Sequence, residues 1–472
     1  MNLNQTLQEK YPHLEISVLK LSEVQKDNES KRIDSEFFKK EYFDAMETMQ
    51  LNQVEYLGDN MKFNSRYSQP KYDETSKIKV INSQYIRNEY IDYENAKSGY
   101  GKIVPKESVL INATGVGTLG RVFINILDFD FSIDSHINVI VVKNKTYLNP
   151  YFLAIFLQSY YGQIQIIRYY SGTSGQIEIY PRDFNYFKIP IFPMEFQLEI
   201  QNLVKDSHKA LEESKELYKK AEETLYLELG LDPKNPLQSL LDSKTNIPTN
   251  SPNISIHTLK ESFLKTGRLD SEYYQSKYED IEKFIKSYPN GYDSFSNIIN
   301  NKDTNFTPKN NENYSYIELA NIGNNGNISE PISDLGKNLP TRARRIVSKG
   351  DVIISSIEGS LSSCALITQE FDKHLVSTGF FVLNSKLLNG ETLLVMFKSQ
   401  IFQEYLKKFP SGTILCAINK EELSKILIPK IDPTTQEKIA KYIQESFNLR
   451  KKSKQLLDNA KNKVEEQIQG KI

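Results

Sequence analysis

The chain has 472 residues and a formal net charge of −1, with 39% hydrophobic, 11% aromatic and 25% charged residues. This composition is typical of a soluble folded protein and excludes disorder as the main state. No apolar run reaches the roughly 20 residues that span a membrane, and no secretory signal is recognisable. Two cysteines, Cys364 and Cys416, are too few for a disulfide framework or a zinc cluster. We therefore expect a cytoplasmic protein of several domains.

An internal repeat is the most informative feature of the sequence. Residues 32–38 read R-I-D-S-E-F-F, and residues 268–274 read R-L-D-S-E-Y-Y. More pairs follow in the same order at a nearly constant offset, which indicates a duplicated chain whose halves share one plan. The further pairs are residues 104–111 (VPKESVLI) with 347–354 (VSKGDVII), Ser171-Gly172-Thr173 with Ser411-Gly412-Thr413, and Ile189-Pro190 and Gln197 with Ile428-Pro429 and Gln436.

Both halves predict the same order of elements. Each opens with a helix, over residues 37–49 or 273–287, and contains one more helix, over residues 150–161 or 391–408. Short runs of β-branched and aromatic residues lie between clusters of Gly, Asn and Asp, a pattern typical of strands. We expect strands at residues 109–112, 122–126, 137–142, 352–354 and 380–383.

Each half ends in a segment whose apolar and small residues recur every three to four positions, beginning after Pro193 or Pro433. Sustained heptad spacing predicts a coiled coil, and proline suits the first turn of a helix because its missing N–H needs no partner there. About 35 residues at 1.5 Å each make a helix of roughly 50 Å. Because the heptad-spaced apolar faces of the two helices match, we expect the helices to pair with each other. The alternative is that each helix packs separately on its own half. Residues 230–253, with four prolines, are the expected linker.

Motifs that suggest catalysis have simpler interpretations. Residues 115–120 (GVGTLG) match a dinucleotide fingerprint, but a strand is predicted after them. Because a pyrophosphate needs the N-terminus of a helix there, we expect a tight turn instead. Asn149-Pro150 resembles part of an adenine methyltransferase motif without its second proline, and we expect a helix start. The histidines are scattered, so we predict no catalytic residue, no metal site and no bound cofactor.

Two basic stretches, one in each half, are candidates for DNA contact. The second-half stretch places three guanidinium groups before a predicted strand, and such groups bind guanine or phosphate bidentately. The first-half stretch alternates basic and aromatic side chains in a polar segment. We interpret the two as equivalent sites, with a solvated basic surface as the alternative for each residue. The candidates are Arg66, Tyr67, Lys71 and Lys77 in the first half and Arg342, Arg344 and Arg345 in the second.

The motifs, in the same order twice, resemble the specificity subunit of type I restriction–modification enzymes. The resemblance covers nearly the whole chain. In the first half it rests on residues 110–122 (LINATGVGTLGRV), Gly172-Thr173 with 176–179 (QIEI), and 189–200 (IPIFPMEFQLEI). In the second half it rests on residues 350–355 (GDVIIS), 410–414 (PSGTI) and 428–439 (IPKIDPTTQEKI).

The resemblance implies an α+β fold with two tandem α/β target recognition domains, each followed by a long helix. The two helices would form an antiparallel coiled coil, related by a pseudo-two-fold internal repeat. We expect the first domain and helix at residues 1–192 and 193–230, a linker at 231–256, and the second domain and helix at 257–431 and 432–472.

The resemblance also implies a non-catalytic subunit that reads a bipartite, asymmetric sequence in double-stranded DNA. It would direct adenine-N6 methylation and restriction by two methyltransferase subunits and by restriction–translocation subunits. S-adenosylmethionine, ATP and Mg are expected on those partners and not on this chain. Two alternatives remain open. Binding of S-adenosylmethionine by the isolated chain would indicate a fused enzyme, and DNA binding without sequence preference, or none, would indicate a coiled-coil scaffold.

Overall fold

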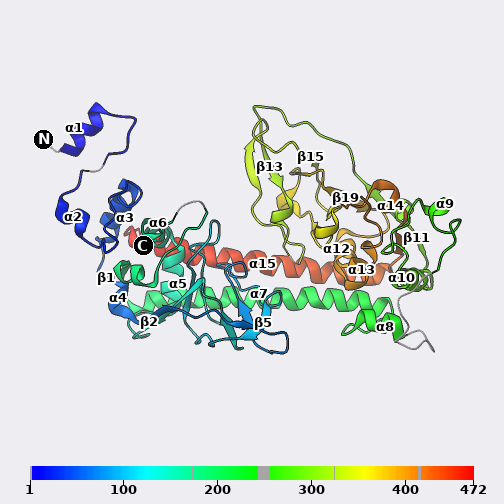
Figure 1. Cartoon of the computed structure of the whole chain (residues 1–472), viewed down its shortest axis with the longest axis horizontal. Helices are drawn as coiled ribbons and strands as arrows, with labels where there is room; N and C mark the ends of the chain where they lie inside the picture. Colours follow the sequence, from blue (N-terminus) through cyan, green and yellow to red (C-terminus); the bar gives the residue numbers. More distant parts are fainter. Residues whose placement is uncertain are drawn as a thin grey trace. The chain divides into compact units, whose positions relative to one another are not determined.

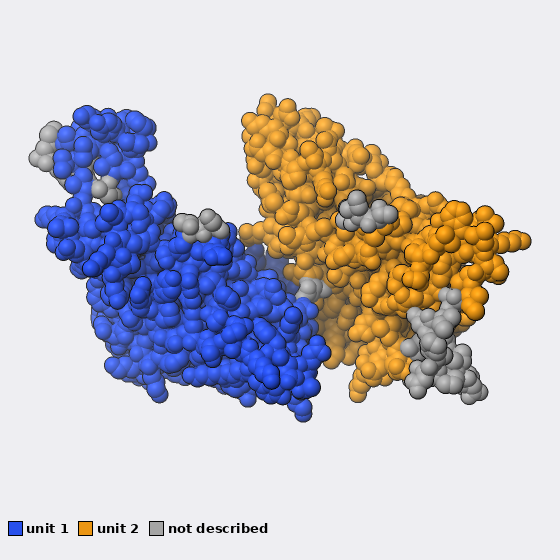
Figure 2. Space-filling model, in the orientation of Figure 1, with its two compact units in different colours: residues 1–212, 450–472 blue, residues 213–449 orange. Residues whose placement is uncertain are grey.

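The computed structural model describes residues 3–16, 18–172, 175–242, 256–323, 325–412 and 416–471 (Figure 1). The chain divides into two compact units, which Figure 2 shows in different colours. Unit 1 comprises residues 1–212 and 450–472, and unit 2 comprises residues 213–449. Each unit therefore contains one α+β part together with a portion of both long helices, α7 (Met194–Glu228) and α15 (Pro433–Ile468).

Unit 1 contains two four-stranded sheets, with strand orders β2-β9-β6-β7 and β3-β5-β4-β8, and a two-stranded sheet of β1 and β10. Strand side chains alternate between faces, so Leu110 joins a core with side chains of the second sheet, while Val109 and Ile111 join a core with the helices. The strands are β1 (Val54–Tyr56), β2 (Met61–Arg66), β3 (Lys71–Tyr72), β4 (Lys79–Ile81), β5 (Lys97–Tyr100), β6 (Val109–Asn112), β7 (Val122–Ile124), β8 (Phe131–Ile133), β9 (Ile137–Val142) and β10 (Lys188–Pro190). The helices are α1 (Leu3–Lys10), α2 (Leu21–Gln25), α3 (Lys40–Met49), α4 (Leu57–Asn60), α5 (Pro150–Gln158) and α6 (Tyr160–Tyr169).

Unit 2 repeats this plan, with strand orders β12-β19-β16-β17 and β14-β13-β18-β15 and a pair of β11 and β20. In each second sheet the same two strands run parallel, β4 with β8 and β13 with β18. The strands are β11 (Tyr292–Ser294), β12 (Ile299–Asn301), β13 (Asn313–Ile317), β14 (Ile332–Leu335), β15 (Ala343–Ile346), β16 (Val352–Ser355), β17 (Cys364–Leu366), β18 (Leu375–Ser377), β19 (Phe380–Ser385) and β20 (Leu427–Pro429). The helices are α8 (Pro236–Asp242), α9 (Phe263–Thr266), α10 (Ser276–Lys286), α11 (Phe295–Ile298), α12 (Gly390–Lys398), α13 (Gln400–Leu406) and α14 (Lys420–Lys425).

The predicted strands are confirmed as β6, β7, β9, β16 and β19, and the predicted opening helices as α3 and α10. The single helix predicted inside each half is wrong, because each is two helices that meet at a serine. Ser159 separates α5 from α6, and Ser399 separates α12 from α13; both have extended backbone angles. Each hydroxyl donates to a carbonyl of the helix that ends there, at 2.6 Å from Ser159 to Phe156 and 2.7 Å from Ser399 to Met396. Serine favours such local bonds, which compete with a continuing helix.

The repeated glutamine after each Ile-Pro pair joins a long helix to its own α+β part. Gln197 accepts the Asn149 N–H at 2.8 Å and donates to the carbonyls of Tyr147 and Phe192 at 3.0 and 2.8 Å. Gln436 makes the same three bonds in unit 2, to Asn389, Leu387 and Ile431, at 2.9, 3.0 and 2.9 Å. Because both side chains are buried, their amides are satisfied internally, and the start of each long helix is fixed to the helix that Asn149 or Asn389 caps.

Helices α7 and α15 pair in antiparallel fashion within each unit. In unit 1 the Ser207 hydroxyl donates to the Ser453 carbonyl at 2.9 Å, and in unit 2 the Ser446 hydroxyl donates to the Ser214 carbonyl at 2.7 Å. All four serines are buried. The two pairs lie one heptad apart on both helices, in opposite directions, as an antiparallel register requires. Packing of each helix on its own half alone is therefore excluded.

The first part of the segment predicted as a linker, residues 230–253, contains a helix. Helix α8 lies within it, and Leu240 joins the core of unit 2. Proline at position 236 is the first residue of this helix, where it is tolerated. The part of the predicted linker after residue 242 lies outside the described residues.

Candidate nucleic-acid interface

Three loops meet in unit 1 where β6 ends and β9 begins. The Ala113 N–H donates to the His136 carbonyl at 2.9 Å, and the Ile179 N–H donates to the Ala113 carbonyl at 2.9 Å. Ser171 and Glu178 exchange two backbone bonds of 2.8 Å. We call this arrangement the loop corner of unit 1 and define it as residues 113–115, 134–136, 171–172 and 177–179.

Unit 2 builds its loop corner, residues 356–358, 377–379, 411–412 and 416–418, with the same backbone bonds. Ser356 donates to the Gly379 carbonyl at 2.9 Å, and Ile418 donates to the Ser356 carbonyl at 2.8 Å. Ser411 and Ala417 exchange bonds of 3.0 and 3.1 Å. The side chains differ at equivalent positions: Thr114, His136 and Glu178 of unit 1 correspond to Ile357, Gly379 and Ala417 of unit 2. One backbone frame thus carries two different sets of side chains.

Glycine is required at the repeated Ser-Gly step of both corners. Gly172 has φ +113° and Gly412 has φ +133°, in the region that side chains disfavour. A Cβ on Gly172 would lie 2.1 Å from the Gln176 carbonyl oxygen. The residues that follow, Thr173 and Thr413, lie outside the described residues. The tight turn predicted for residues 115–120 is confirmed, since three glycines with positive φ connect the antiparallel strands β6 and β7.

The unit 1 corner presents hydrogen-bonding side chains. The Thr114 hydroxyl lies 3.0 Å from His136 Nδ1, and the main-chain N–H of His136 donates to the Asp134 carboxylate at 2.9 Å. Burial raises the pKa of Asp134. Among the described residues, no group of three or more His, Cys, Asp or Glu side chains could hold a metal ion. The corner is therefore suited to recognition through donors and acceptors.

The first-half candidates differ in availability. Arg66, at the end of β2, donates to the Glu178 carboxylate and to the Ile179 carbonyl, so it braces the loop corner. Tyr67 is only 6% exposed and packs in the core between the sheets, so its ring is withdrawn from solvent. Lys71 and Lys77 are exposed, and neither side chain has a hydrogen bond or ion pair within the described part of the chain.

The second-half candidates also differ in whether their side chains are available to contact DNA. Arg342 is exposed, its side chain has no partner among residues that the structure describes, and its carbonyl accepts the Thr378 N–H at 2.9 Å, beside the corner residue Gly379. Arg344 donates to the Thr341 carbonyl at 3.0 Å and the Thr307 hydroxyl at 3.1 Å. Arg345 donates to the Phe380 carbonyl, and burial lowers its pKa. Of the three guanidinium groups, only that of Arg342 is available.

The two basic stretches are not equivalent, contrary to the sequence interpretation. Ile346 pairs with Leu375 of β18, and the matching bridge in unit 1 joins Ile103 to Ser132 of β8. The equivalent of Arg345 is therefore Lys102, whose Nζ lies 4.7 Å from the centre of the Tyr67 ring. Sequence reasoning missed Lys102, although extending the match of residues 104–111 with 347–354 backward by two positions would have found it.

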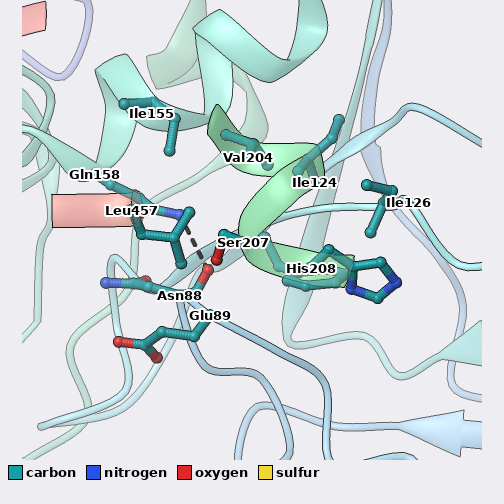
Figure 3. Close-up of a pocket in the computed structure, with 11 residues that line it drawn as sticks. Asn88, Glu89, Ile124, Ile126, Ile155, Gln158, Val204, Ser207, His208 and Leu457 are labelled. Atoms are coloured by element: carbon teal, nitrogen blue, oxygen red, sulfur yellow. Dashed lines mark hydrogen bonds between the residues drawn. The ribbon is translucent and has the colours of Figure 1, made fainter. Parts of the chain in front are cut away.

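The small pocket in Figure 3 lies where β7, α5 and the long helices of unit 1 meet. Gln158 fills one side of it and donates to the carbonyls of Asn88 and Val122 at 3.2 and 2.9 Å. Its other walls combine apolar side chains such as Ile155, Val204 and Leu457 with the polar residues Asn88, Glu89, Ser207 and His208. None of the described helices is long and apolar enough to cross a membrane.

Residues 44–223 match the protein family described as the type I restriction modification DNA specificity domain. The chain is 30% identical over 159 residues to the type I restriction enzyme HindI specificity subunit of Haemophilus influenzae, and the match covers 33% of each protein. The chain thus spans about a third of the length of this curated relative. These matches confirm the resemblance to type I specificity subunits.

Solved structures similar to the chain carry related descriptions. The S subunit of a type I restriction–modification system from M. genitalium is 15% identical, with a TM-score of 0.42, over 89% of this chain and 95% of that one. The HsdS subunit from Thermoanaerobacter tengcongensis is 14% identical, with a TM-score of 0.27, over 89% of this chain and 97% of that one.

Proposed function

We propose that the chain, whose residues 44–223 match the type I restriction modification DNA specificity domain, is a non-catalytic subunit that reads a bipartite, asymmetric DNA sequence. Each unit reads one half-site through its loop corner and the basic residues beside it. The observation that supports this most strongly is the loop corner itself, built twice on the same backbone bonds with different side chains. The family match lies in the first half, and the shared frame extends the assignment to the second.

The chemistry of the two corners supports unlike half-sites. Base edges in the major groove are distinguished by their pattern of donors and acceptors. Unit 1 offers a hydroxyl, an imidazole and a carboxylate where unit 2 offers an isoleucine, a glycine and an alanine, so the same bases would not satisfy both. Lys71, Lys77 and Arg342 are exposed cations that would hold the phosphate backbone or a guanine.

The chemistry of methylation and cleavage belongs, in this proposal, to partner subunits. Two methyltransferase subunits would modify adenine N6 with S-adenosylmethionine, and restriction–translocation subunits would use ATP and Mg. The site of action would be the cytoplasm, where the DNA lies.

Arg342→Ala should weaken binding of the assembled complex to its DNA about tenfold, since a bidentate contact to a base is worth roughly 1–3 kcal/mol. Recognition should relax in one half-site only, because Arg342 borders the corner of unit 2 alone. Lys349→Ala is the matched control. Lys349 is an exposed cation just before β16, and the loop corner of unit 2 follows the opposite end of that strand. Fluorescence anisotropy with DNA altered in either half-site measures both effects. Equal losses at the two half-sites, or the same loss with Lys349→Ala, would contradict separate reading by the two units.

A further inference from the structure

The most closely repeated motif, residues 32–38 and 268–274, makes one contact twice. In unit 1 the Arg32 guanidinium binds both carboxylate oxygens of Asp34, each at 2.7 Å. Its Nη1 also donates to the main-chain carbonyls of Arg168 and Tyr170, at 3.1 and 2.7 Å. Asp34 in turn accepts the Phe37 N–H at 3.2 Å, which closes a turn ahead of α3. The motif is therefore a clamp that holds the chain where α6 ends.

Unit 2 holds the end of α13 in the same way. Arg268 binds both oxygens of Asp270, at 2.7 and 2.9 Å, and donates to the carbonyls of Phe409 and Pro410 at 3.3 and 2.8 Å. Asp270 accepts the Tyr273 N–H at 3.1 Å. Bidentate pairs of arginine with carboxylate fix orientation as well as adding energy. The bidentate pair with aspartate and the contact to the carbonyl just before the repeated serine recur in both units, which indicates that the arginine serves the same purpose in each.

The clamped carbonyls lie immediately before the loop corners. Tyr170 precedes Ser171, and Pro410 precedes Ser411, the serines whose backbone bonds begin the corner in each unit. From Ser171 the bonds continue through Glu178 and Ile179 to Ala113 and on to His136. A series of main-chain hydrogen bonds thus links the clamp to the recognition groups of the same unit.

Apolar packing and the arginine contacts together hold this segment. Phe37, inside the first motif, is fully buried, and its ring centre lies 5.5 Å from that of Tyr169. Ile33 and Leu269, the neighbours of the two arginines inside the motif, are 87% and 69% exposed. The hydrogen bond from Arg32 lowers the pKa of Asp34. The arginines add direct contacts to the main-chain carbonyls of Tyr170 and Pro410, next to the corners.

We propose that Arg32 and Arg268 are positioning residues for DNA recognition, each setting the loop corner of its own unit in the conformation that reads a half-site. The inference rests on the proposed function and adds residues that lie outside the basic stretches. Because each arginine acts through backbone carbonyls, its effect is confined to one unit. Lysine cannot replace it, since an ammonium group lacks the planar fork that engages Asp34 and two carbonyls together.

The test compares wild type, Arg32→Lys and Arg268→Lys by mapping N6-methyladenine at base resolution in cells that carry each version of the full chain. We expect Arg32→Lys to introduce degenerate bases into one half of the methylated motif and Arg268→Lys into the other half. At the best-matched sites, methylation should fall at least threefold. Lys39→Ala is the control, a half-exposed cation on the same segment that forms an ion pair with Glu36. It should leave both halves of the motif unchanged.

Asp34→Asn and Asp270→Asn guard against loss of folding, because asparagine keeps an acceptor for the turn but removes the charge. These variants should give a milder relaxation of the same half-site as the arginine variant of that unit. Unfolding midpoints of the purified variants identify any that do not fold. An unchanged motif in folded variants, or equal relaxation of both halves, would overturn the positioning role. Absence of any motif that depends on the wild-type gene would overturn the proposed function itself.

Discussion

Ser207→Leu is expected to lower the free energy of unfolding by roughly 2–6 kcal/mol. The serine is 2% exposed between α7 and α15, and its hydroxyl lies 2.9 Å from both the hydroxyl and the carbonyl of Ser453. Leucine is much larger than the serine in this close helix contact, and overpacking of a core costs roughly 1–3 kcal/mol. The buried Ser453 hydroxyl would also lose its partner, at a cost of roughly 1–3 kcal/mol. Ser446→Leu, its equivalent in unit 2, should behave alike.

Two further variants separate these causes in urea unfolding. Ser207→Ala removes the hydrogen bonds without adding volume and should cost about 1 kcal/mol. Lys219→Leu adds the same side chain at an exposed position of α7 and should change the unfolding free energy by less than about 0.5 kcal/mol. If Ser207→Leu were as mild as Lys219→Leu, the close antiparallel contact of the helices would be wrong.

Gly162→Ala is expected to destabilise unit 1 by at least about 2 kcal/mol. An added Cβ would lie 2.3 Å from the Phe156 carbonyl oxygen and 2.4 Å from the Leu157 Cα, and both are backbone atoms of α5 that cannot move aside cheaply. The glycine allows α6 to begin directly against the end of α5, after the break at Ser159. Chemical denaturation followed by circular dichroism measures the loss.

Gly359→Ala is the matched control for this prediction. A Cβ at that position would meet no atom within 4 Å, and its backbone does not have a positive φ. We expect its midpoint to stay within the error of wild type. A Gly162→Ala protein as stable as Gly359→Ala would show that α5 and α6 meet less closely than described.

Periodicity predicted several strands and the long helices, because alternation and heptad spacing are local properties of the sequence. It did not predict the breaks at Ser159 and Ser399, since the apolar pattern continues across both. Pairing between strands is a property of the tertiary structure, and this is why Arg345 was matched with the wrong residues of the first half. When β15 is aligned with the first half through its pairing with β18, the residue equivalent to Arg345 is Lys102.

The side-chain types of the candidate residues predicted the DNA-contact site only in part. Arginine and tyrosine were expected to contact DNA, but the same groups serve packing when a carbonyl or a core lies nearby. Arg66 and Arg345 satisfy main-chain carbonyls, and Tyr67 fills the space between two sheets. Exposure, which separates Lys71, Lys77 and Arg342 from them, depends on the fold. The loop corners were visible in sequence only as the repeated Ser-Gly-Thr.

In the proposed function, the two units read two different half-sites for a methyltransferase partner. A base-resolution map of N6-methyladenine in the source genome, with and without this gene, tests it most directly. We expect a split, asymmetric motif that disappears when the gene is removed. A genome with active methyltransferase partners and no motif dependent on the gene, or a motif with two identical halves, would contradict the account.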